Sequence, residues 1–178
     1  MEEAGNFSEA FLVYLKDASE SLNHGLLVRG ALSCSCAATC LAKMGYSSEA
    51  HQLYLEAAML YEENADLVIA KSIRESLWCL EEAYEHFLLA SDRKRAERVF
   101  YKHVSLVTRI NPFQGEPIHS LSNKRHAIEV AQITSRDNTH ASEITKTMKN
   151  FLVSKKNART ITNSKFDAST MPERKSKN

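Results

Sequence analysis

Two segments of this chain repeat one pattern of apolar and polar positions. The pattern places side chains at i, i+3, i+4 and i+7, which is the spacing of one apolar stripe on an α-helix. In the first segment the stripe is Ala50, Leu53, Tyr54, Ala57, Leu60 and Tyr61. Forty-six residues later it is Ala96, Val99, Phe100, His103, Leu106 and Val107. Because both stripes have the same internal offsets, the sequence predicts a helical repeat.

The periodicity predicts five main helices, over about residues 8–24, 26–44, 47–63 and 66–90, and from Ser91-Asp92 to about residue 110. Gly25 and Gly45 are expected to end the first two, because glycine readily adopts the left-handed conformation that closes a helix. Asp66 is the expected N-cap of the fourth. Short connections make neighbouring helices antiparallel, so the predicted fold is all-α. The second and third helices form one hairpin, and the fourth and fifth form another.

The pattern changes after Pro112. Residues 111–123 read as a loop, and short helices are expected over 124–133 and 139–153. From Ser154 onward the chain carries too few apolar side chains to offset the entropy lost on ordering, which predicts disorder. The expected organisation is a helical repeat domain over 1–110, a segment packed on it over 111–153, and a disordered basic tail over 154–178. The packing stripe of the second short helix is Ile144, Met148, Phe151 and Leu152.

Charge divides the chain in two, although the net charge is only +1. Residues 1–90 hold 14 acidic and 5 basic residues, whereas residues 91–178 hold 8 acidic and 18 basic residues. A basic tail can bind nucleic acid through phosphate contacts. Two other interpretations remain open: the tail keeps the protein soluble, or it lies against the acidic helices of its own chain.

Cysteine usage and hydropathy indicate a cytoplasmic protein. The acidic first residues lack the basic start and apolar run of a secretory signal, and no apolar stretch of about 18 residues could span a membrane. Three cysteines lie in one apolar helix, where Cys34 and Cys36 point about 200° apart, so small buried hydrophobes are expected rather than a zinc site. The four cysteines are Cys34, Cys36, Cys40 and Cys79.

Residues 26–110 resemble tetratricopeptide repeats. The second helix of such a repeat carries an alanine, an aromatic residue four positions on, and a small residue three further. The chain matches this half of the signature with Gly45, Ala50, Tyr54 and Ala57. The small, small and large residues expected on the first helix are Ala37, Ala38 and Leu41. The spacing of 46 exceeds the usual period of about 34 residues, and the long helices also look like those of SNAP-type adaptors. The resemblance implies an α-α superhelix.

The resemblance also implies a binding face, because the first helix of each hairpin lines the concave side in that family. Carried over, this face includes Ser35 and Thr39 on the second helix. An acidic face with an aromatic anchor suits a basic or amphipathic peptide. We therefore expect a non-enzymatic protein-protein interaction adaptor, with terminal caps or a homodimer making up for the small number of repeats. The partner-binding positions expected on the fourth helix are Arg74, Trp78, Glu81 and Glu85.

An alternative function rests on Arg98 and His103. Their spacing resembles the R-x4-6-H motif of HEPN ribonucleases, small all-α proteins that use arginine and histidine for acid–base and phosphate chemistry. In a regular helix the two residues lie about 140° apart, and His103 falls on the apolar stripe, which favours a buried histidine. The alternative is a HEPN-like ribonuclease, or an RNA-binding protein that uses both residues and the basic tail.

No enzyme, metal or cofactor is predicted. Glu81, Glu82, Glu85 and His86 lie close together in the sequence, but helical di-iron sites use Glu-x-x-His pairs from more than one helix. Glu82 and His86 are four residues apart, and no second set follows. The chain also lacks a phosphate-binding glycine loop and a nucleophile elbow.

Overall fold

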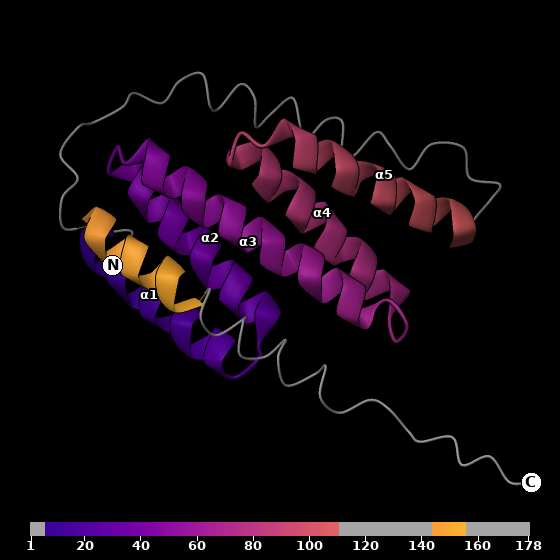
Figure 1. Ribbon diagram of the computed structural model, residues 1–178, viewed down its shortest axis with the longest axis horizontal. Helices are drawn as coiled ribbons and strands as arrows, with labels where there is room; N and C mark the ends of the chain where they lie inside the picture. The colour runs from indigo at the N-terminus through magenta and orange to yellow at the C-terminus, as the bar shows by residue number, and fades with distance from the viewer. Residues whose placement is uncertain (1–5, 111–143, 156–178) are drawn as a thin grey trace, which may run out of the picture. The chain divides into compact units, whose positions relative to one another are not determined.

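The computed structural model describes residues 6–110 and 144–155, which lie in separate compact units. The first range contains five α-helices that follow one another in order (Figure 1). The all-α prediction is confirmed, and consecutive helices pack as hairpins. The helices are α1 (Phe7–Asn23), α2 (Leu27–Lys43), α3 (Ser47–Val68), α4 (Ile73–Leu89) and α5 (Arg93–Ile110).

The boundary between α3 and α4 was wrongly predicted. Helix α3 continues to Val68, and Asp66 lies inside its last turn instead of capping the next helix. The N-cap of α4 is Ser72, whose extended backbone lets its side-chain oxygen accept a hydrogen bond from the Glu75 N–H at 3.2 Å. Within α3 the Asp66 carboxylate pairs with a residue remote in sequence, since it lies 2.6 Å from the Lys102 ammonium.

Three of the four connections use the same turn. Each contains one residue with positive φ: Gly25 at 71°, Gly45 at 85° and Ser91 at 60°. In each, the next residue donates its backbone N–H to the carbonyl five residues earlier, at 2.9, 2.9 and 2.8 Å respectively. This is the Schellman arrangement, which satisfies the last carbonyls of a helix and reverses the chain. The predicted helix-ending roles of Gly25 and Gly45 are confirmed.

Alternate helices run parallel to one another. Three side-chain hydrogen bonds join α3 to α5, and in all of them the two residues are 36 apart in sequence, which indicates parallel helices in a fixed register. Between α2 and α4, the Ser35 hydroxyl lies 2.8 Å from the His86 ring. The helices therefore form two layers, with α3 and α5 in one and α2 and α4 in the other. The three α3–α5 pairs are Met59–Arg95, Glu62–Arg98 and Asp66–Lys102.

The repeated stripe forms the core. All six residues of its first copy are buried, as are four of the six in its second copy. Phe100 and Val107, the other two in the second copy, are half-buried. Cys34, Cys40 and Cys79 are buried and unoxidised, as expected of cysteines that act as small hydrophobes. The largest fully buried side chains of this unit are Phe11, Leu41, Leu53, Leu60, Leu80, Phe87 and Val99.

A sixth helix covers residues 144–155. It confirms part of the helix predicted over 139–153 and extends two residues further, so Ser154 and Lys155 are helical. The expected loop over 111–123, the expected helix over 124–133 and the remainder of the predicted disordered tail lie outside the described residues.

Candidate functional site

Corresponding positions on α2 and α4 form a candidate binding surface, which we call the α2–α4 face. The 46-residue repeat relates Leu32 to Trp78, Ser35 to Glu81 and Thr39 to Glu85. Leu32 is 56% exposed and Trp78 is 43% exposed. Each hairpin therefore places one large apolar side chain in solvent at the same place. The α2–α4 face consists of Leu32, Ser35, Thr39, Arg74, Trp78, Glu81 and Glu85.

Trp78 is held in position from one side. Its ring meets the ring of Tyr61 on α3 edge to face, with centroids 5.8 Å apart and planes at 85°. Tyr61 is buried, and burial raises the pKa of its hydroxyl, so this group is neutral at physiological pH. An aromatic side chain that is supported on one edge and exposed elsewhere suits an anchor for a bound peptide, because little rotamer entropy is lost on binding.

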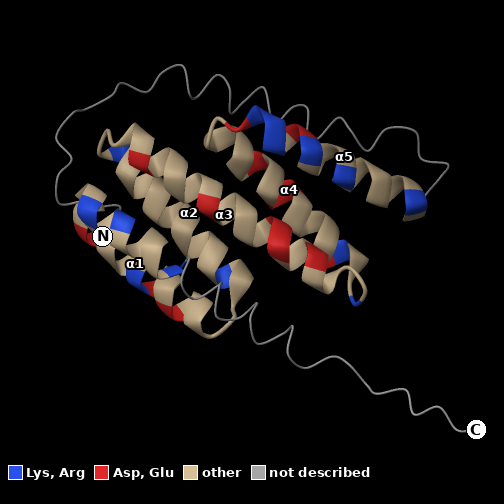
Figure 2. Ribbon diagram, in the orientation of Figure 1, with Lys and Arg blue, Asp and Glu red and all other residues tan. Residues whose placement is uncertain are grey.

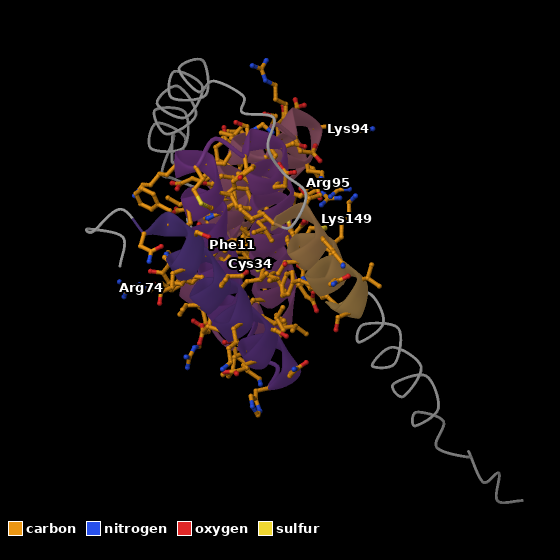
Figure 3. All side chains as sticks on the ribbon, turned by 90° about the vertical axis from the view of Figure 1, so that its left-hand side faces the viewer. Phe11, Cys34, Arg74, Lys94, Arg95 and Lys149 are labelled. Atoms are coloured by element: carbon orange, nitrogen blue, oxygen red, sulfur yellow. The ribbon has the colours of Figure 1, made fainter. Side chains whose placement is uncertain are left out.

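The acidic positions of the face differ from each other. Glu81 turns toward α5, where its Oε1 lies 3.2 Å from Nε2 of His103. Glu85 is half-buried, and Arg74 is exposed at the molecular surface (Figure 3). Of the four residues predicted on this helix, Glu81 thus also joins α4 to α5. Local sequence could not predict this contact, because Glu81 and His103 are 22 residues apart.

Ser35 and Thr39 make internal hydrogen bonds. The Thr39 hydroxyl donates to the Ser35 carbonyl at 3.0 Å and lies 3.1 Å from the Tyr54 hydroxyl. The Ser35 hydroxyl meets the buried ring of His86. On α2, the α2–α4 face is therefore preorganised by contacts to α3 and α4, and its exposed apolar residue is Leu32.

His86 is a buried polar residue. The sequence analysis considered it only as a metal ligand and predicted no other role for it. Its Nδ1 lies 2.7 Å from the Glu82 carbonyl, which can only accept, so Nδ1 carries the proton and Nε2 accepts from the Ser35 hydroxyl. Burial is the main reason that the pKa of His86 lies below its usual range. The repeat offers one way to predict that His86 is buried, because His86 occupies the position that corresponds to the buried Cys40.

Arg98 and His103, the residues of the alternative function, contact different helices. The Arg98 guanidinium lies 2.6 Å from Glu62 on α3, at the surface. His103 is buried between α4 and α5, and burial lowers the pKa of its ring although the nearby Glu81 carboxylate opposes the shift. The structure therefore does not bring these two side chains to one another.

Within residues 6–110 and 144–155, no cluster of three or more histidine, cysteine or acidic side chains has the geometry to hold a metal ion. None of the helices described is both long and apolar enough to cross a bilayer. Comparisons with known protein families, with curated proteins and with solved structures found no match.

Proposed function

We propose that this protein is a non-enzymatic interaction module whose α2–α4 face binds a protein or peptide partner. The observation that carries the proposal is the exposure of Leu32 and Trp78 at corresponding positions of two successive hairpins. Apolar anchors repeated at a fixed spacing suit an extended partner that contacts both hairpins.

The acidic residues around Trp78 favour a partner that carries basic residues beside its apolar ones. Glu85 belongs to the face, and Glu81 lies at its edge toward α5 with a side chain that is 34% exposed. Charge complementarity of this kind raises association rates and selects among partners. The proposed partner is therefore a basic or amphipathic segment.

We also propose that the helical array is of the tetratricopeptide or SNAP-like kind. Support comes from the paired antiparallel helices, the parallel packing of alternate helices, and the burial of Ala50, Tyr54 and Ala57. This architecture commonly serves protein recognition.

The test is co-purification of a tagged full-length chain from native lysate, followed by binding measurements with the recovered partner. We expect Trp78→Ala and Leu32→Asp each to weaken binding at least about tenfold, as is usual for apolar anchors. Tyr101→Ala is the matched control, because it removes an exposed aromatic ring from α5, away from this face. If both face variants retain the partner at wild-type affinity, the assignment of this face is wrong.

A further inference from the structure

Trp78 shares one side of α4 with two carboxylates, those of Glu82 and Glu85. Successive residues of an α-helix turn by about 100°, so both glutamates lie within about 40° of Trp78 around the helix axis. Trp78 is 43% exposed, and the two glutamates are half-buried. We call Trp78, Glu82 and Glu85 the Trp78 site.

The two carboxylates lie on the side of α4 that meets α2 and α3. Burial raises the pKa of the Tyr61 hydroxyl on α3, and the Glu82 charge raises it further. Burial lowers the pKa of the His86 ring, while the Glu82 carbonyl and the Glu85 charge oppose that shift. Because His86 contacts Ser35 of α2, both carboxylates border the α2–α4 face. Glu82 is therefore a further residue of this face.

Glu81 takes part in a different contact. Around the axis of α4, Glu81 and Glu82 lie on opposite sides of Trp78. The Glu81 carboxylate turns toward α5, where it lies 3.2 Å from the His103 ring. The carboxylates nearest to the exposed side of Trp78 are thus those of Glu82 and Glu85, and Glu81 serves as a comparison within the same helix.

The charges of α4 do not follow the helix dipole. The helix carries four acidic residues and one basic residue (Figure 2). Arg74 lies in the first turn and Glu85 close to the last, where the dipole favours the opposite charges. Among the described residues the cation–π contact is that of Lys43 with Phe7, so Arg74 does not cover the Trp78 ring. The ring remains accessible to a cation from another molecule.

We propose that the Trp78 site binds an arginine side chain of the partner, with the guanidinium on the Trp78 ring and paired with Glu82 and Glu85. The face of an indole ring attracts cations, and carboxylates only accept hydrogen bonds, so all three groups favour this ligand. Leu32 offers the apolar contact on α2. This inference rests on the proposed function and narrows the partner to a segment with arginine beside an apolar residue.

The test uses the full-length chain and two labelled peptides of alternating leucine and arginine or leucine and citrulline. Citrulline has nearly the shape of arginine and no charge. By fluorescence anisotropy we expect the arginine peptide to bind at least about tenfold more tightly than the citrulline peptide. Trp78 is the one tryptophan of the chain, so its fluorescence should change on binding. Equal binding of both peptides, or no binding of the arginine peptide, overturns the inference.

Variants locate the charge that selects arginine. Glu82→Gln and Glu85→Gln should each weaken binding of the arginine peptide by about threefold to tenfold and leave the citrulline peptide unaffected. Glu81→Gln is the matched control and should change neither, because this carboxylate lies against His103. Arg74→Gln removes a cation from the same face and should strengthen binding of the arginine peptide slightly, which a folding defect would not do. Wild-type affinity in both Glu82→Gln and Glu85→Gln contradicts the inference.

This inference and the proposed function can fail separately. If Trp78→Ala abolishes binding of the recovered partner while Glu82→Gln and Glu85→Gln retain it, the α2–α4 face is the binding surface and the arginine site is wrong. If neither Trp78→Ala nor the glutamine variants affect the partner, both assignments are wrong. Circular dichroism checks that each variant is folded.

Discussion

Ser91 adopts a backbone conformation that is unfavourable for residues with a Cβ atom. Its φ of 60° matches the glycines of the two equivalent turns, and Gly45 is its counterpart 46 residues earlier. This conformation is about 1 kcal/mol or more less favourable for other residues than for glycine. The third turn therefore forms despite local strain, because the hydrogen bonds at the end of α4 and the packing of α4 on α5 hold it.

Ser91→Gly should raise the free energy of unfolding by about 0.5 to 1 kcal/mol, since it removes the strain at some cost in unfolded-state entropy. Urea titration measures the change. The matched variant is Gly45→Ser, which introduces the same side chain into the equivalent turn and should destabilise the protein by about 1 kcal/mol. A Ser91→Gly protein that is less stable than wild type would contradict this account.

His86 should make stability depend on pH. Burial keeps the pKa of its ring below the usual value, while the Glu82 carbonyl and the Glu85 charge act in the opposite direction. The unfolded chain therefore binds a proton more readily than the folded chain. Stability contributed by the neutral ring is present above the unfolded pKa of about 6.5 and is lost as the pH falls from there toward the folded pKa.

His86→Gln should reduce this acid sensitivity, which urea titrations between about pH 8 and about pH 5 can measure. The dependence of the free energy of unfolding on pH should become weaker without vanishing. The pKa of the buried His103 is lowered as well, so His103 contributes to this dependence with the same sign. The variant is expected to be less stable at neutral pH, since it alters the hydrogen bond with Ser35. An unchanged slope would show that His86 does not titrate in this range.

At the scale of helices, periodicity and glycine placement predicted the five helices and most of their ends. The prediction of the α3–α4 boundary was wrong because Asp66 and Ser72 are both good N-caps, and local sequence offers no way to choose between them. In the structure Asp66 lies in the last turn of α3, where its carboxylate pairs with Lys102, 36 positions further along the chain. Trp78 was predictable as part of a helical face. The contact of Glu81 with His103 was not, because it depends on how α4 and α5 pack.

The α3–α5 edge offers a direct measurement of coupling between alternate helices. Glu62 lies within 4 Å of both Arg98 and Lys102, at 2.6 and 3.6 Å. A double-mutant cycle with Glu62→Ala and Arg98→Ala should give a coupling free energy of about 0.5 to 1 kcal/mol, because the arginine is largely exposed. In about 1 M salt the coupling should fall toward zero. Coupling that persists at high salt would indicate a contribution from packing instead of charge.

Across residues 6–110, charge is distributed very unevenly. Residues 6–92 hold 13 acidic and 5 basic residues, whereas α5 holds one acidic and six basic residues. The uneven distribution follows the helices, since basic residues gather on α5 and acidic residues on α3 (Figure 2).

The position of α5 at one end of this helical unit has a consequence for motion. Helix α3 buries nine residues and α5 buries four, so opening α5 exposes less apolar surface. We expect amide hydrogens of α5 to exchange with deuterium faster than those of α3, with the last turn of α5 fastest. Mass spectrometry of timed exchange can resolve this gradient. Local unfolding within residues 6–110 is therefore expected to open α5 before α3.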